Sequence, residues 1–95
     1  MQLFTFYLYY RGGTYISQAY ARTPELAPKV WAEQLDYKEI YGIGSKGKEY
    51  LIKRIESEIP VPITGVLNTW CFGTLVNGAV AEIHFTQTAE NTQVL

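Results

Sequence analysis

Residues 41–49 read YGIGSKGKE, a stretch that matches two phosphate-binding patterns at once. Its glycines, Gly42, Gly44 and Gly47, spell the G-x-G-x-x-G of dinucleotide-binding folds, in which the backbone approaches a pyrophosphate closely. Residues 42–48 also spell G-x-x-x-x-G-K, a P-loop that lacks the final Ser or Thr. Both patterns raise the question of whether the chain binds a nucleotide.

The residues around this stretch argue against a nucleotide site. A P-loop follows a strand and places Ser or Thr after its lysine to hold magnesium, whereas here that position is Glu49, which would repel phosphates. The dinucleotide pattern requires a βαβ unit, but the segment after the next helix reads IPVPITG. We therefore expect a connection between two helices, in which Gly42 or Gly44 ends the first and Ser45 caps the second. No cofactor is predicted, and adventitious anion binding at the helix start is the remaining alternative.

A second set of residues could support nucleophilic catalysis. Cys71 and His84 are the only cysteine and histidine, and counting outward from the turn Asn77-Gly78 places them opposite each other, with Glu82 on the same face. A cysteine nucleophile needs such a histidine and a third group to orient the ring. Cys71, His84 and Glu82 are therefore candidate catalytic residues, although a flat strand offers neither oxyanion donors nor a pocket. One cysteine and one histidine are too few soft ligands for zinc, so no metal is predicted.

Two predicted β-hairpins position these residues. The first pairs residues 3–10 with residues 14–21, which are rich in aromatic and β-branched types, around a two-residue turn at Gly12-Gly13. Large residues on one strand then oppose small ones on the other, which leaves room for a helix. The second hairpin has one apolar face, made of Trp70, Phe72, Thr74, Val76, Ala79, Ala81, Ile83 and Phe85.

The reverse side of the first hairpin carries a large apolar area, made of Tyr7, Tyr9, Ile16 and Tyr20. Fully burying each such side chain is worth about 1.5 to 3 kcal/mol, and exposed patches of this kind usually mark an interface. We predict self-association or a protein partner at this surface. Cover by the second hairpin or the C-terminal tail is one alternative, and tolerance of tyrosines with wet hydroxyls is another.

Two helices are predicted between the hairpins. Thr23 is the expected N-cap of the first, with Pro24 at the first helical position. Pro28 disturbs the first turn, so a later start is the alternative. The expected core-facing residues are Leu26, Val30, Trp31 and Leu35 in the first helix and Leu51, Ile52, Ile55 and Ile59 in the second. The segment IPVPITG then forms a linker, because residues before proline are pushed to extended geometry.

These elements predict an α+β fold in ββααββ order. We expect about four strands in a mainly antiparallel sheet, with both helices packed on one face. Residues 1–87 form a single domain in this interpretation, and residues 88–95 form a polar, flexible C-terminal tail.

Composition excludes some classes of partner. The 95 residues are 47% hydrophobic and 18% charged, which is typical of a globular protein. A formal net charge of -1 provides no electrostatic footprint for nucleic acid or an anionic membrane, and no apolar run approaches the length of a membrane span. A single thiol and an N-terminus without signal-peptide features indicate a cytoplasmic protein.

Four stretches, GGTYISQ, WAEQLDYKEI, SKGKEYLIKRI and VPITGVLNTWCFGTLVNGAVAEI, together resemble a group of small uncharacterised bacterial proteins of similar length. This resemblance implies no activity and no functional residue. Separately, a glycine-turn hairpin followed by a Thr-capped helix looks like the start of the HicB-type antitoxin fold, whose members bind a partner protein. The third strand expected before that helix is absent here, and no DNA-binding segment follows.

The sequence therefore predicts a small non-enzymatic protein-interaction module. It would form a homodimer or bind another protein through the aromatic sheet face. The alternative is a small enzyme or small-ligand binder that uses Cys71, His84 and Glu82.

Overall fold

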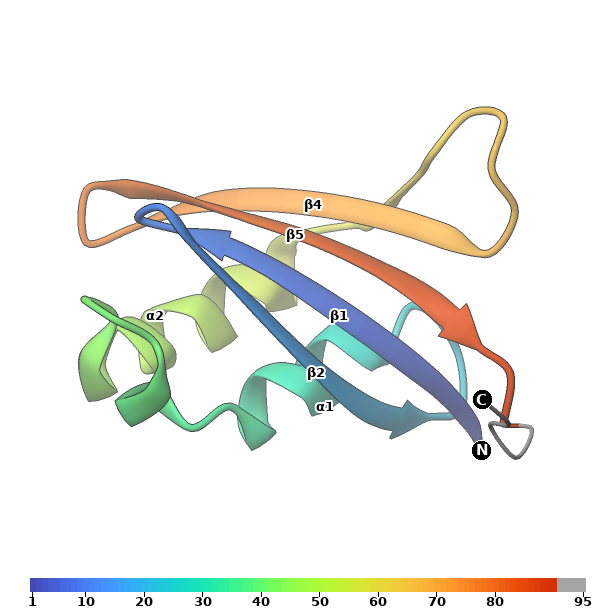
Figure 1. Ribbon diagram of the computed structural model, residues 1–95, viewed down its shortest axis with the longest axis horizontal. Coiled ribbons are helices and arrows are strands. Elements are labelled where there is room, and N and C mark those ends of the chain that lie inside the picture. The colour runs from blue at the N-terminus through green and yellow to red at the C-terminus, as the bar shows by residue number, and fades with distance from the viewer. Residues whose placement is uncertain (91–95) are drawn as a thin grey trace, which may run out of the picture.

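The structure, a computed structural model, describes residues 1–90 as one antiparallel sheet with two α-helices beneath it (Figure 1). Residues 91–95 of the predicted tail lie outside the described residues. The elements in chain order are β1 (Gln2–Tyr10), β2 (Gly13–Ala21), α1 (Ala27–Gln34), the 3-10 helix η1 (Tyr37–Glu39), α2 (Gly44–Ser57), β3 (Val61–Pro62), β4 (Thr69–Val76) and β5 (Ala79–Thr88). The α+β class is confirmed.

The sheet has five strands in the order β2-β1-β5-β4-β3, and every neighbouring pair is antiparallel. The predicted ββααββ order and the predicted count of about four strands each fall one strand short, because two residues of the expected linker, Val61 and Pro62, pair with β4 as β3. The central pair is β1 and β5, in which Phe6 lies opposite Phe85. Both helices lie on the same side of this sheet (Figure 1).

The turn of the first hairpin lies one residue earlier than predicted. Arg11 and Gly12, with φ of 48° and 81°, form the two-residue loop, and Tyr10 pairs with Gly13. Gly13 is a strand residue beneath the ring of Tyr15, since a Cβ at this position would come within 2.6 Å of the tyrosine hydroxyl oxygen. The correction moves the register by two residues, so every side chain keeps its predicted face.

The second hairpin is confirmed as predicted. Asn77 and Gly78 form its loop with φ of 52° and 77°, and Cys71 lies opposite His84. An Asn-Gly pair adopts the left-handed conformation at both loop positions with little strain, which is why the turn and the register could be predicted together.

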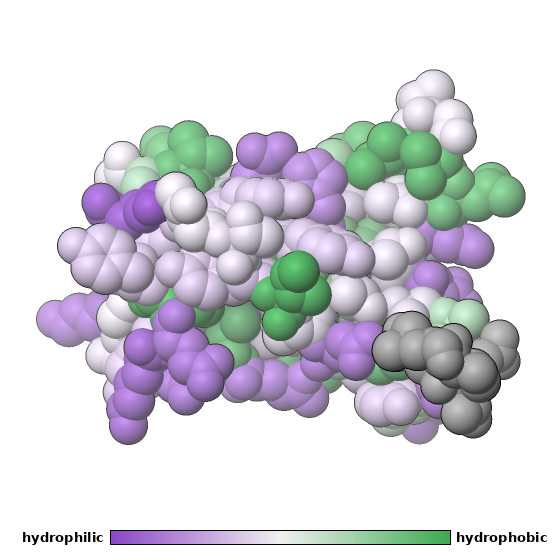
Figure 2. All heavy atoms as spheres, viewed as in Figure 1, coloured by the Kyte–Doolittle hydropathy of each residue, from purple (hydrophilic) through white to green (hydrophobic). Residues whose placement is uncertain are grey.

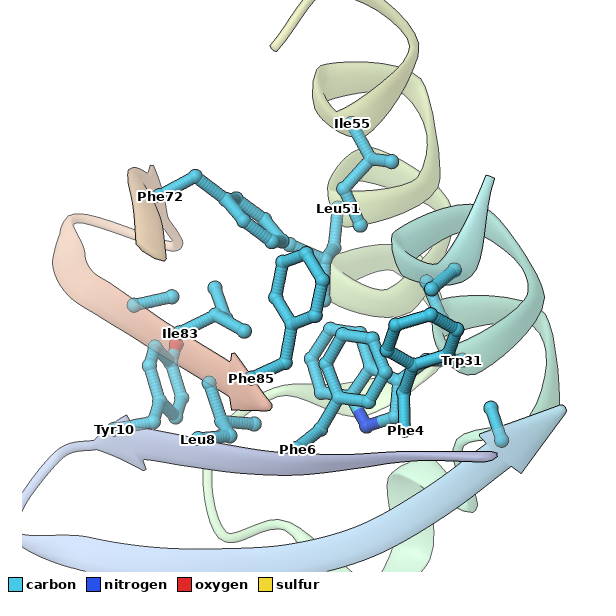
Figure 3. Packing of buried hydrophobic residues seen from close by; sticks show 14 of the residues in the cluster. Phe4, Phe6, Leu8, Tyr10, Trp31, Leu51, Ile55, Phe72, Ile83 and Phe85 are labelled. Atoms are coloured by element: carbon cyan, nitrogen blue, oxygen red, sulfur yellow. The ribbon is translucent and has the colours of Figure 1, made fainter. Parts of the chain in front are cut away.

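Stacked aromatic rings form the centre of the core (Figure 3). The ring of Phe6 in β1 stacks on Trp31 of α1, with centroids 4.8 Å apart, and on Phe85 of β5, with centroids 4.7 Å apart. The indole Nε1 of Trp31 donates a hydrogen bond to Ser17 Oγ at 2.9 Å. This stack joins α1 to both central strands and to the edge strand β2.

Helix α1 begins at Ala27, so Thr23 is not its N-cap and the later start is confirmed. The carbonyl of Thr23 accepts hydrogen bonds from the backbone N–H groups of Leu26 and Ala27, which closes a separate turn before the helix. Pro28 occupies the first turn of α1, where its missing N–H costs nothing. Leu26 is 52% exposed, contrary to prediction, whereas Trp31 is buried as expected. The other predicted positions lie half-buried against the core: Val30 and Leu35.

Helix α2 presents most of its predicted apolar positions to the sheet. Leu51 and Ile55 are buried, and Ile52 packs half-buried against the core. Ile59 is 82% exposed, because α2 ends at Ser57 and the chain has left the helical path before this residue. The predicted burial of Ile59 is therefore wrong.

Asn77 links the two hairpin turns to the connection before α2 through its side chain and its backbone. Its Nδ2 donates hydrogen bonds to the carbonyls of Gly42 at 3.2 Å and Ile43 at 3.0 Å. The backbone carbonyl oxygen of Asn77 accepts a hydrogen bond from Arg11 Nη2 at 2.7 Å. Asn77 therefore contacts both the first hairpin turn and the segment that leads into α2.

We predict that Asn77→Gly lowers the free energy of unfolding by about 1 to 2 kcal/mol, because it removes two hydrogen bonds worth about 1 kcal/mol each. Glycine keeps the positive φ of the turn, so the loss reports the side chain. Asn68→Gly is the matched control, because Asn68 also has positive φ (57°). It should change stability by less than about half of that loss, as measured by urea unfolding. Equal losses for the two variants would contradict the assignment.

Candidate protein interface

The lysine of the P-loop-like stretch caps a helix. Lys48 Nζ donates hydrogen bonds to the carbonyl oxygens of Glu33 at 3.0 Å and Leu35 at 2.7 Å, at the C-terminal end of α1. Such carbonyls have no partner within their own helix, and a cation stabilises them. Ser45 does not cap α2, contrary to prediction, because the N-cap position is Ile43 and makes no side-chain bond.

The glycines of the same stretch allow close packing of α2 and a change in the direction of the chain. A Cβ on Gly47 would lie 2.9 Å from Ile43 Cγ1 and 3.0 Å from Asn77 Nδ2, so only glycine lets α2 approach the second hairpin turn without displacement. Gly42 has a φ of 83°, but it does not end α1, which already ends at Gln34. The predicted helix connection is correct in kind and longer than expected, since η1 lies within it.

The face of the sheet that points away from the helices, called the outer face below, brings both predicted site sets together. One residue from each strand lies in a single row across it. In the order β2, β1, β5, β4 and β3, this row is Ile16, Tyr7, His84, Cys71 and Val61. Tyr7 therefore lies directly opposite His84, and the aromatic set and the Cys-His set form one surface.

The aromatic residues of the outer face are well exposed. Ile16 is 62%, Tyr20 50% and Tyr9 44% exposed, and Tyr7 is half-buried between its neighbours. The ring of Tyr9 meets the ring of His84 edge to face, with centroids 5.9 Å apart. Within residues 1–90 no helix or strand covers this side of the sheet (Figure 1).

Within residues 1–90, charged residues lie almost entirely outside the strands. The chain has eight Lys and Arg and nine Asp and Glu residues, yet only Glu82 lies within a strand of residues 1–90. In Figure 2, residues of intermediate hydropathy run across the middle of the molecule over the strands, and hydrophilic residues gather mainly around the margin. The outer face is therefore broad, aromatic and almost uncharged.

In the Cys-His-Glu set, no hydrogen bond joins Cys71 to His84 among the described residues. His84 Nε2 lies 3.7 Å from Glu82 Oε1, and His84 Nδ1 is buried with no hydrogen-bond partner among the described residues. A histidine that activates a cysteine uses one nitrogen on the thiol and orients the ring through the other. Here Cys71 is a half-buried free thiol in the middle of the row, which fits a role in surface packing.

Two features of the structure were not expected from the sequence. The loop between β3 and β4 projects from the sheet (Figure 1) and exposes Val66 at 52% and Leu67 at 88%. A groove of about 340 Å³ lies between β2 and α1, and its walls include Ser17, Trp31 and Leu35. The apolar residues in VPITGVL were the available signal for the loop. The groove has no such signal, because it depends on how α1 packs beneath β2.

No protein-family model, no curated protein and no solved structure matches the chain. The resemblances to small bacterial proteins and to the HicB-type fold stay predictions. Every helix in residues 1–90 is too short or too polar to cross a membrane. The same residues contain no group of three or more His, Cys, Asp or Glu side chains arranged to hold a metal ion.

We predict that Lys48→Met lowers the free energy of unfolding by about 1 kcal/mol, because it removes the bonds to the end of α1. Lys46→Met is the control, since Lys46 is exposed in the same helical turn, and it should leave stability within about 0.5 kcal/mol of wild type. ATP with magnesium should leave the melting temperature of all three proteins unchanged. A nucleotide-dependent rise that only Lys48→Met abolishes would restore the P-loop interpretation.

Cys71 should react with iodoacetamide at neutral pH no faster than a small free thiol, because no hydrogen bond joins it to His84 among residues 1–90. The same rate, within about twofold, is expected in His84→Gln. Mass spectrometry of timed, quenched samples measures both rates. An acceleration that disappears in His84→Gln would instead support the catalytic alternative.

Proposed function

We propose that this chain is a non-enzymatic protein-interaction module that binds another protein through its outer face. The observation that carries the proposal is the composition of that face: in the strands of residues 1–90, which expose Tyr9, Ile16 and Tyr20, Glu82 is the only charged residue. Burying side chains of this size is worth about 1.5 to 3 kcal/mol each, which is the usual source of affinity at interfaces.

The chemistry of the face favours a protein with an apolar, uncharged patch of its own. Tyrosine supplies large, rigid contact area at low cost in side-chain entropy, and its hydroxyl finds a hydrogen-bond partner at the rim. A polyanion such as nucleic acid would meet no cation within the strands. The free thiol of Cys71 in the same row is consistent with the cytoplasmic location that we propose.

The test compares two double variants with the same chemical change in different places. Tyr7→Lys plus Tyr9→Lys places two charges on the outer face. Tyr41→Lys plus Tyr50→Lys places them on exposed tyrosines of the helical side, 78% and 46% exposed. Proteins captured from an extract of the source cells by each variant and by wild type are quantified by mass spectrometry.

A partner protein should be captured by wild type and by the Tyr41/Tyr50 variant, and lost at least roughly tenfold with the Tyr7/Tyr9 variant, since truncating an aromatic anchor commonly costs about 2 kcal/mol or more. Circular dichroism confirms that both variants are folded. Capture of the same proteins in equal amount by all three, or of none by wild type, would refute binding through the outer face.

A further inference from the structure

The two edges of the sheet differ in how they are protected. At one edge, β3 has two residues, Val61 and Pro62, and follows Pro60. Short length and proline both discourage strand pairing, because proline has no N–H to donate. At the other edge, β2 has nine residues, GTYISQAYA, with neither charge nor proline, and pairs with β1 without a bulge. Monomeric proteins usually protect edge strands of this length, and β2 carries none of the usual devices.

The free side of β2 presents a regular row of backbone donors and acceptors. Pairs in an antiparallel ladder alternate between hydrogen-bonded and non-hydrogen-bonded, and the pair beside a two-residue turn, here Tyr10 with Gly13, is hydrogen-bonded. The residues whose backbone groups point away from β1 are therefore Thr14, Ile16, Gln18 and Tyr20. None of them takes part in the backbone hydrogen bonds found outside the helices and strands of residues 1–90.

We propose that this row pairs with β2 of a second copy of the chain, antiparallel and around a twofold axis at Ser17. In this register Ile16 of each copy lies opposite Gln18 of the other, and Thr14 lies opposite Tyr20. The outward-pointing backbone groups of the two copies then meet each other, as an antiparallel ladder requires. Small or polar residues oppose larger ones, and no charge opposes another.

The middle of β2 has space on both of its faces for this pairing. Ser17 points toward the helices yet is exposed, because the groove of about 340 Å³ opens beneath it between β2 and α1. Ala19, by contrast, is covered and only 2% exposed. The axis therefore passes where the strand is open, and the inward side chain that meets its own copy is small. Beside it, Tyr15 lies opposite the small Ala19 of the other copy.

The difference between the edges also favours a second copy as the occupant. A pair formed through β2 uses the long free edge of each copy and leaves only the two-residue β3 at both ends of the joined sheet. The assembly closes at two copies, as an isologous interface does. Because β2 is uncharged and matches itself around Ser17, no complementary sequence from another protein is needed. The pairing rests on backbone groups and is independent of what binds the outer face.

Gln18→Pro is the main test. Proline removes the N–H of residue 18, which points away from β1, and leaves the ladder between β1 and β2 intact. Light scattering after size-exclusion chromatography should give twice the 10.8 kDa chain mass for wild type and the single chain mass for Gln18→Pro. Gln18→Thr is the matched control: it loses the same side-chain bond to Thr5 Oγ1 (3.1 Å) but keeps the N–H, so it should remain a dimer.

Ser17→Cys in a Cys71→Ser background tests the register without a proline. Residues opposite each other in a non-hydrogen-bonded antiparallel pair have Cα atoms about 4.5 Å apart, which is within disulfide range. Mild oxidation should therefore link two copies through residue 17 on a non-reducing gel. Gln18→Cys in the same background lies off the axis and should link at least roughly tenfold more slowly.

Three results would overturn the proposal. The first is a wild type that stays monomeric at concentrations up to about 100 μM, because its dissociation constant would then be too high for a specific dimer. The second is a dimer that Gln18→Pro leaves intact. The third is a monomeric wild type that captures another protein's strand and loses it in Gln18→Pro but not in Gln18→Thr. The outer-face variant Tyr7→Lys plus Tyr9→Lys should remain dimeric, so failure of face binding is distinguishable from failure of edge pairing.

Discussion

The pairing of β1 with β5 is the interaction on which the rest of the structure depends. It joins residues close to both ends of the chain, such as Phe4 with Gln87 and Phe6 with Phe85, and makes one sheet from two hairpins. A lone two-stranded hairpin is marginally stable in water. Once the hairpins are joined, the ring of Phe6 lies between those of Trp31 and Phe85, and the aromatic stack that closes the core becomes possible.

Local features of the fold could be predicted from the sequence because they have local causes. The Asn77-Gly78 turn sets its own register, and Cys71 opposite His84 follows from it. The predicted register of the first hairpin differs from the observed one by two residues, yet the predicted faces are correct, because the side-chain period of a strand is two. The sequence allows two starting points for α1, because either Pro24 or Pro28 can occupy the first turn of a helix.

The features that were predicted wrongly depend on residues that are distant in the sequence. The strand that was not predicted, β3, consists of one valine and one proline, a pair that does not match any sequence pattern for a strand. It forms because the edge of β4 is available for pairing. Ser45 is a good capping residue by type, but Gly44 already lies in α2 and Asn77 supplies the polar contacts at this connection. The P-loop-like lysine, Lys48, serves α1, which it can reach only in the folded chain.

The strand order also changes the meaning of the candidate sites. From the sequence, the tyrosine set and the Cys-His set stood as competing explanations, one for an interaction module and one for an enzyme. Because β5 lies between β1 and β4, Tyr7 and Cys71 flank His84 in one row, and the histidine becomes part of the aromatic surface. The same order places β2 at the border, since β5 already occupies the other side of β1. The uncharged strand is therefore the exposed edge, and the outer face extends to it without interruption at Ile16 and Tyr20.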